Sequence, residues 1–269
     1  MRRSPLSTSQ TTTPATEHHP AWAHQFDSME QQRDASSFGM WVFLLTEIMM
    51  FGGLFTAYLI YRIKYYDAFV AGSSSIDVKW GFYNTLVLIG SSFTMAMAVW
   101  AAHKGKRMLL VLNLVLTMVL GTVFLGVKAV EYKAKYDECH IPGGVIGKGF
   151  SATGALGCTA EGNIAEDLEH PKNKAGKEVA GKPRAAAEQI ARQTEIFFVF
   201  YFAMTGLHAT HMIIGMGVLI WLLRRSWRAE FGPEYYTPIE NFGLYWHFVD
   251  IVWIYLFPLL YLINRIPHK

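Results

Sequence analysis

Residues 39–63 read GMWVFLLTEIMMFGGLFTAYLIYRI, and this apolar stretch decides the class of protein. A membrane-spanning helix needs about 20 mostly apolar residues, because each residue adds about 1.5 Å toward a hydrocarbon core of about 30 Å. The stretch is long enough, and Glu47 is its one acidic residue. A carboxylate at the centre of a membrane helix costs about 2.5–3.5 kcal/mol on insertion scales. We therefore expect Glu47 either to remain neutral or to find a partner elsewhere in the chain.

Four further stretches have the same apolar character, in a chain that is 52% hydrophobic and only 17% charged. Soluble domains carry about a quarter charged residues. No alternating pattern of a β-barrel is present, so the spanning elements are expected to be helices. The sequence predicts an all-α polytopic membrane protein, a five-transmembrane-helix bundle with spans at about residues 39–63, 82–102, 108–130, 196–223 and 242–263.

Polar segments divide the chain around these helices. Residues 1–38 are rich in Ser, Thr, Pro and Gln and are expected to form a flexible tail. Helices one to three occupy residues 39–132, with a short polar loop after the first. A polar insertion at residues 133–192 precedes helices four and five, which lie within residues 193–269.

Basic residues beside the spans predict the orientation. Because the basic residues lie in short segments beside apolar spans, the net charge of +3 reflects membrane topology and does not indicate nucleic-acid binding. The tail and the loops after helices two and four share one side and carry more Lys and Arg than the opposite short segments. The positive-inside rule then places the N-terminus in the cytoplasm and the C-terminus in the periplasm. The insertion would be periplasmic, where Cys139 and Cys158 either form a disulfide, which we favour slightly, or remain free thiols.

Ionisable side chains inside the predicted helices are the candidate functional groups. By helix rise, Glu47 lies about 12 Å from the cytoplasmic end of its helix. His247 and Asp250 are spaced to pair on one helix face. His103 ends helix two on the same side. A polar layer is expected in the cytoplasmic half of the membrane, formed by Glu47, His208, His211, His247 and Asp250.

Three interpretations of this layer remain open. The histidines could bind a metal or sandwich a haem, the acids and histidines could mark a proton path, or the groups could form hydrogen bonds that fix helix packing. We favour packing, with a proton-linked or lipid-linked role next. Close helix contacts are also expected at glycines such as Gly52, Gly53, Gly215 and Gly217.

The chain resembles subunit III of the haem-copper oxidases, the cytochrome c oxidase and quinol oxidase group, in its short five-helix bacterial form. Five segments in the right order carry the resemblance, and they are WVFLLTEIMMFGGLF, FYNTLVLIGSSFTMAMAVWAAHKGKR, LGTVFLGVKAVEY, TGLHATHMIIG and YWHFVDIVW. The family positions that match include Glu47, His103, Glu131, His208, His211, His247 and Asp250. Each segment alone is a weak match, and the ordered set is specific.

The resemblance implies a non-redox subunit with no catalytic site, no metal and no cofactor of its own. Haem and copper would belong to the partner subunits I and II. The chain would pack on subunit I, hold phospholipid, and support proton uptake and stability during aerobic electron transport in a bacterial plasma membrane. Glu47 would be the family's carbodiimide-reactive acid, which requires a protonated carboxyl in apolar surroundings.

Two features depart from the family pattern. Lys128 stands where glutamine is usual, near the outer end of its helix, from which it is expected to snorkel toward the interface. The insertion 133–192 is longer than usual, and we expect it to contact an external partner such as a periplasmic cytochrome domain or another respiratory complex.

Other functions are weighed against this one. A bis-histidine haem b electron carrier would use His208 or His211 with His247 or His103. A proton-coupled carrier would be built around Glu47 and Asp250, although no internal repeat supports it. Within the family, the related subunit of a quinol oxidase or of a nitric oxide reductase also fits the sequence.

Overall fold

The computed structural model describes residues 23, 25–138, 140, 142, 160–170 and 181–263 of the chain. Over these residues the protein is all α-helical, with seven helices and no named strand. Five of the helices are long and apolar enough to cross a membrane, which confirms the predicted number of spans. They are α1 Met29–Lys64, α3 Val78–His103, α4 Arg107–Asp137, α6 Arg184–Trp227 and α7 Thr237–Tyr261.

The helices extend beyond the apolar stretches that predicted them. α1 begins at Met29 because Ser28 caps it, its hydroxyl accepting a hydrogen bond from the Gln31 backbone amide at 3.1 Å. Part of the predicted tail is therefore helical. α6 begins at Arg184, so the end of the predicted insertion continues directly into a span, and α5 Ala160–Glu169 lies within that insertion.

The expected polar loop after the first span is instead helix α2, Tyr66–Ser74. Phe69, Gly72 and Ser73 of α2 are buried. A Cβ atom built on Gly72 would lie 2.3 Å from the Phe197 ring of α6, so α2 packs too closely on α6 for any larger residue there. Serines and a glycine indicated a loop, but here they provide the small surface that lets α2 pack against α6.

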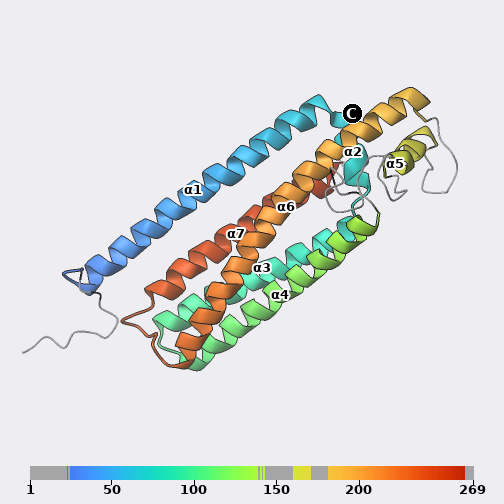
Figure 1. The fold of residues 1–269 in the computed structure, drawn as a ribbon. Helices are drawn as coiled ribbons and strands as arrows, with labels where there is room; N and C mark the ends of the chain where they lie inside the picture. The colour runs from blue at the N-terminus through green and yellow to red at the C-terminus, as the bar shows by residue number, and fades with distance from the viewer. Residues whose placement is uncertain are drawn as a thin grey trace, which may run out of the picture.

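α3 and α4 form a tight antiparallel hairpin, and α6 and α7 pack against it (Figure 1). Gly105 turns the chain between α3 and α4 with a φ of 64°, a conformation that glycine adopts without strain. Between helices, the Trp246 indole donates to Ser91 at 2.9 Å. The Thr94 and Thr117 hydroxyls are 2.7 Å apart. Such bonds fix the relative rotation of helices that lipid would otherwise leave free to turn.

α1 lies along the outside of the bundle, beside α7 and α6 (Figure 1). Its buried residues are only Leu44, Phe51 and Tyr58, which recur once every seven positions. This spacing makes one narrow seam, in contrast to the wide apolar face of a helix in a soluble core. Glycines were expected to mark close contacts, but Gly52 and Gly53 face open space, whereas a Cβ on Gly215 would lie 3.0 Å from Trp246.

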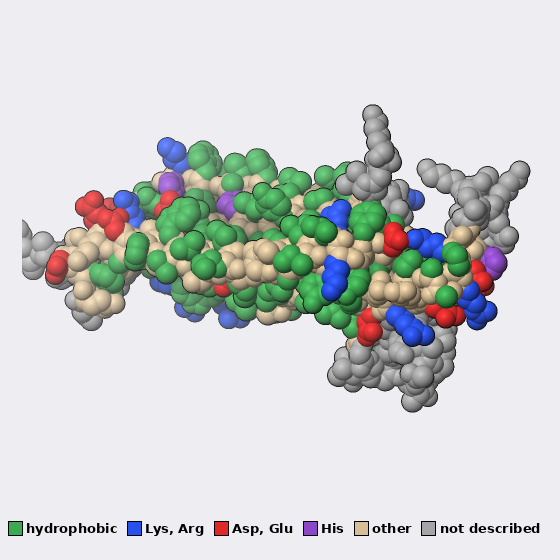
Figure 2. Space-filling view, turned by 90° about the horizontal axis from the view of Figure 1, so that it is seen from above, with side chains coloured by type: hydrophobic (Ala, Val, Ile, Leu, Met, Phe, Trp, Pro, Cys, Tyr) green, Lys and Arg blue, Asp and Glu red, His purple; other side chains and the backbone are tan. Residues whose placement is uncertain are grey.

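The start of α1 and the loops after α3 and α6 lie at one end of the bundle. The Arg107 guanidinium donates to the Trp227 carbonyl, and the Arg33 guanidinium lies 3.4 Å from the Tyr236 hydroxyl. Charged side chains gather mostly toward the two ends, with apolar side chains between them (Figure 2). The described part of the chain thus has the charge distribution of a protein that spans a bilayer.

Candidate functional site

Glu47 of α1 and His211 of α6 form the one intramembrane pair that joins two of the predicted layer residues. Glu47 Oε2 lies 3.0 Å from His211 Nε2, and the two side chains are 15% and 11% exposed. His211 Nδ1 lies 2.9 Å from the Leu207 carbonyl, and since a carbonyl only accepts, Nδ1 carries a proton. Nε2 and the carboxyl therefore share one further proton. Glu47, the acidic residue of the first predicted span, therefore has a partner on another helix.

Aromatic side chains hold this pair in place. The Phe51 ring packs against the His211 ring with centroids 5.4 Å apart. The Tyr245 hydroxyl of α7 donates to the His211 carbonyl at 2.8 Å. The Glu47–His211 bond is thus one of the contacts that hold α1 on the bundle, together with the hydrogen bond from the Tyr58 hydroxyl to the Leu259 carbonyl and the one from the Asn241 amide to Ser36.

His208 has no hydrogen bond to either ring nitrogen within the described residues. Its ring is 1% exposed and packs against Phe124 and Trp253, with centroids 5.5 and 5.2 Å away. His208 and His211 lie three positions apart on one helix, yet one packs among aromatic rings and the other bonds an acid. The sequence alone did not separate these two roles.

His247 and Asp250 do not form the expected pair. His247 Nδ1 lies 2.7 Å from the Ser92 hydroxyl of α3. The Ser92 hydroxyl also lies within loose hydrogen-bonding reach of the Asp250 carboxyl. Neither carboxyl oxygen makes a hydrogen bond of full geometry within the described residues. Asp250 is 2% exposed. The predicted layer is thus divided into a bonded pair on α1 and α6 and a separate group on α3 and α7.

Lys128 and Glu131 form a buried cluster near the other end of α4. Lys128 is 4% exposed, and its ammonium donates to Glu131 at 2.9 Å and to Tyr261 at 3.0 Å. Both Tyr201 and Tyr261 donate to Glu131 Oε1, at 2.8 and 2.6 Å. The expectation that Lys128 would snorkel outward is wrong, because an acid and aromatic side chains at the same level give the ammonium its partners inside the bundle.

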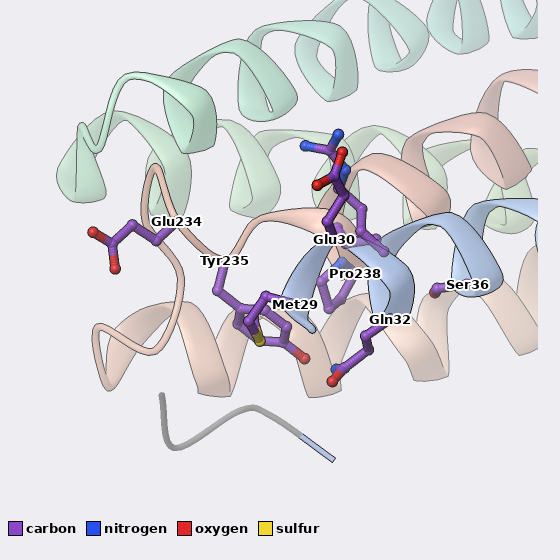
Figure 3. Close-up of a pocket in the computed structure, with 9 residues that line it drawn as sticks. Met29, Glu30, Gln32, Ser36, Glu234, Tyr235 and Pro238 are labelled. Carbon is purple, nitrogen blue, oxygen red and sulfur yellow. The ribbon is translucent and has the colours of Figure 1, made fainter. Parts of the chain in front are cut away.

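Each end of the bundle carries a further pocket. A pocket of about 400 Å³ lies between the start of α1 and the chain entering α7, with Glu30 and Glu234 among its residues (Figure 3). His103 is exposed near it and packs on the Tyr236 ring, with centroids 3.9 Å apart, rather than joining the intramembrane groups.

At the opposite end, His140 packs on the Phe198 ring, with centroids 4.6 Å apart. Burial, and next the Lys135 ammonium, lower the pKa of His140 from 6.5 to about 4, so it is neutral near pH 7. A pocket of about 520 Å³ lies at this end, lined by apolar residues together with Glu131 and Lys135.

The predictions for the Cys139–Cys158 disulfide and for the insertion concern parts of the chain that the structure mostly does not describe. Cys139 and Cys158 lie outside the described residues, as does most of the insertion. In the described ranges no three His, Cys, Asp or Glu side chains are grouped as they would be to hold a metal ion.

A family model and the most similar curated proteins all point to one family. The family model described as cytochrome c oxidase subunit III matches residues 23–159 and 186–264. Cytochrome c oxidase subunit 3 of Thermostichus vulcanus is 27% identical over 89% of this chain and 92% of its own length. The cytochrome bo(3) ubiquinol oxidase subunit 3 of Pseudomonas aeruginosa is 23% identical over 90% and 92%. A probable cytochrome c oxidase subunit 3 of Mycobacterium bovis is 30% identical over 85% and 88%.

Proposed function

The chain belongs to the cytochrome c oxidase subunit III family, and we propose that it is the non-redox subunit III of a bacterial respiratory haem-copper oxidase, with cytochrome c as electron donor. Membership of the family makes it a membrane protein and one subunit of an oxidase complex. The observation that carries the proposal is the family match, which includes all five membrane spans. In this role the chain supports oxygen reduction in the other subunits without binding haem or copper itself.

The contacts of the histidines favour this role over a bis-histidine haem carrier. Axial ligation needs two imidazole nitrogens that face each other across a porphyrin. His211 uses Nε2 for Glu47 and Nδ1 for a carbonyl, and His208 packs between aromatic rings. His247 Nδ1 is engaged by Ser92. A haem would have to displace several of these contacts.

The proton shared by Glu47 and His211 supports a link to proton uptake. A carboxyl and an imidazole 3.0 Å apart can hold the proton as a neutral pair or as an ion pair with little movement. The pair can therefore follow local charge during turnover while keeping α1 in place. This fits a supporting role for Glu47, in which loss of the acid shortens enzyme lifetime rather than stopping the reaction.

We assign the bundle end that carries the start of α1 to the cytoplasm. Basic residues in the helix ends and short loops at that end support this orientation under the positive-inside rule, and they are Arg33, Lys104, Lys106, Arg107, Arg224, Arg225 and Arg228. The membrane would be the bacterial plasma membrane, with the C-terminus and residues 133–192 in the periplasm. The insertion would contact a cytochrome domain or another respiratory complex there.

Subunit I would be the main partner, with subunit II in the same complex and phospholipid bound at the protein surface. The test is purification of the native complex through a tag on this chain. We expect subunits I and II to copurify, and the haem absorbance to leave with them when the subunits are separated. A Soret band that stays with this chain in a one-to-one ratio would refute the non-redox role.

A quinol oxidase is the second candidate, because the Pseudomonas aeruginosa relative is named as a ubiquinol oxidase subunit. The same purified complex distinguishes the two donors. Oxygen uptake with reduced cytochrome c and not with a quinol supports the cytochrome c oxidase, and the reverse supports the quinol oxidase.

A further inference from the structure

A pocket of about 520 Å³ lies between the start of α3 and the end of α4, at the same end of the bundle as α2 and α5 (Figure 1). Trp80 of α3 and Val130 of α4 line it and are 56% and 70% exposed. The pocket therefore opens sideways toward lipid and not into the bundle. α1 lies on the opposite side of the bundle (Figure 1). We call this feature the α3/α4 pocket.

The long wall of the pocket is an apolar stripe on α4. Val123, Gly126, Val127 and Val130 are spaced by three or four residues, so they share one face of the helix. The lining continues to Glu138, which lies about 22 Å along the helix from Val123. One leaflet contributes about half of a hydrocarbon core of about 30 Å. The pocket thus has the length of one lipid molecule, an acyl chain together with its headgroup.

Gly126 keeps this wall open. A Cβ atom built on Gly126 meets nothing within 4 Å. On the same helix, a Cβ atom on Gly121 would lie 3.2 Å from the Trp246 ring. Packing inside the bundle therefore requires the glycine at position 121 but not the one at position 126. The space at Gly126 is on the surface, where it can take the carbon atoms of a ligand.

Charged side chains gather at the mouth of the pocket. Asp77 at the start of α3 and Glu138 at the end of α4 are carboxylates, and the lining cation is Lys135. The Lys135 side chain is only 7% exposed, and its ammonium donates to Glu138. Glu131, deeper in the pocket, is already paired with Lys128. Two carboxylates against one ammonium leave the mouth with one excess negative charge.

These charges favour one type of headgroup. Phosphatidylglycerol and cardiolipin bring only negative charge, which the excess negative charge repels. Phosphatidylethanolamine brings a phosphate that Lys135 can bind, and a primary ammonium that can donate to the carboxylates of Asp77 and Glu138. The choline group of phosphatidylcholine has no N–H to donate. Trp80, three residues after Asp77, is a residue type common at the level of lipid headgroups.

We infer that the α3/α4 pocket binds one molecule of phosphatidylethanolamine, with its ammonium at Asp77 and Glu138, its phosphate at Lys135 and one acyl chain along Gly126. The inference deepens the proposed function, which includes phospholipid at the protein surface, by assigning the place and the headgroup. It rests on the proposed orientation in placing this lipid in the periplasmic leaflet. The bound lipid would join the start of α3 to the end of α4 from outside the bundle.

The test is photolabelling of the purified native complex in nanodiscs of phosphatidylcholine. The two probes are phosphatidylethanolamine and phosphatidylglycerol with the same acyl chains, one of which ends in a photoreactive diazirine. Labelled residues are identified by peptide mass spectrometry. We expect the phosphatidylethanolamine probe to label α4 near Val123. Its labelling should exceed that of phosphatidylglycerol by about two- to thirty-fold, because each of two exposed ion pairs contributes about 1.4- to five-fold.

Variants separate the headgroup contacts from the acyl-chain contact. Asp77→Asn combined with Glu138→Gln should make the two probes label equally. Asparagine also caps a helix, so it can keep the bond that Asp77 accepts from the Lys79 amide at 2.9 Å. Gly126→Leu should fill the pocket and reduce labelling of α4 by both probes. Gly217→Leu on α6 is the matched control, because a Cβ atom there also meets nothing within 4 Å, and it should leave the labelling of α4 unchanged.

Several results would overturn the inference. These are no label on α4 from either probe, equal or stronger labelling by phosphatidylglycerol, a headgroup preference that survives Asp77→Asn with Glu138→Gln, or labelling that Gly126→Leu leaves unchanged. If no oxidase subunit copurifies with the unmodified chain, the proposed function itself fails, whatever the labelling. Failure of the lipid site alone leaves copurification intact.

Discussion

Replacing Glu47 with alanine should loosen α1, and replacing it with glutamine should not. In the neutral pair Glu47 bonds His211 Nε2 at 3.0 Å, and a glutamine amide can donate to the same nitrogen. Alanine leaves Nε2 without that partner in a side chain only 11% exposed. Leaving such a buried group unsatisfied costs about 1–3 kcal/mol. We expect Glu47→Ala to lower the stability of the chain in the complex by that amount.

A double-mutant cycle isolates the bond itself. Glu47→Ala and His211→Ala are made singly and together, and the temperature at which the subunit leaves the purified complex is measured. Interhelical hydrogen bonds in membranes are worth about 0.6 kcal/mol on average and at most about 1.7 kcal/mol. The coupling energy should fall within this range. Thr46→Val is the matched control, because the exposed Thr46 hydroxyl bonds its own helix at the Phe43 carbonyl and should show no coupling to His211.

Two outcomes would refute the reasoning about Glu47. A coupling energy of zero would mean that the bond does not hold α1 to α6. Complete loss of oxygen reduction by Glu47→Gln from the first turnover would place the acid on an obligatory proton path, and its supporting role would be wrong. We expect initial turnover close to that of the wild type, followed by faster inactivation.

Three further predictions concern other parts of the bundle. Lys128→Met should destabilise the chain by about 3 kcal/mol in thermal unfolding, because Glu131 loses its buried cation while its two tyrosine donors remain. Gly72→Ala should cost about 1–3 kcal/mol, since its Cβ would overlap the Phe197 ring. His140 should make the free energy of unfolding fall as the pH drops from about 6.5 to about 4, because its folded pKa of about 4 lies below the unfolded value and the unfolded chain binds the proton first.

Each of these predictions has a matched control. Adding Glu131→Gln to Lys128→Met removes the unpaired charge and should recover much of the loss. Gly126→Ala should be tolerated, since a Cβ there meets nothing within 4 Å. His140→Gln should reduce the fall in the free energy of unfolding between about pH 6.5 and about pH 4, and should leave the stability above pH 7 nearly unchanged. Equal losses of stability in Gly72→Ala and Gly126→Ala would contradict the packing of α2 on α6. A pH dependence of stability that His140→Gln leaves unchanged would contradict the burial of His140.

The sequence by itself determined the number and type of the spanning elements. Apolar stretches of about 20 residues can satisfy their backbone in lipid only as helices, so five of them predict five spans. The same reasoning singled out Glu47 and Asp250, because an acid within such a stretch is costly wherever the helix packs. Neither conclusion depends on how the helices are rotated. The small and polar residues of α2 predicted a loop, but they form a helix that packs on α6.

Only the tertiary structure decided which side chains meet. His208 and His211 have nearly the same position on one helix face, yet His211 bonds Glu47 and His208 packs on Trp253. Lys128 turns inward because two tyrosines and Glu131 lie at its level. The physical reason is that hydrophobic length sets the depth of a helix but not its rotation about its own axis. Rotation is fixed by contacts between helices, such as Trp246 on Ser91, and these depend on residues far apart in the chain.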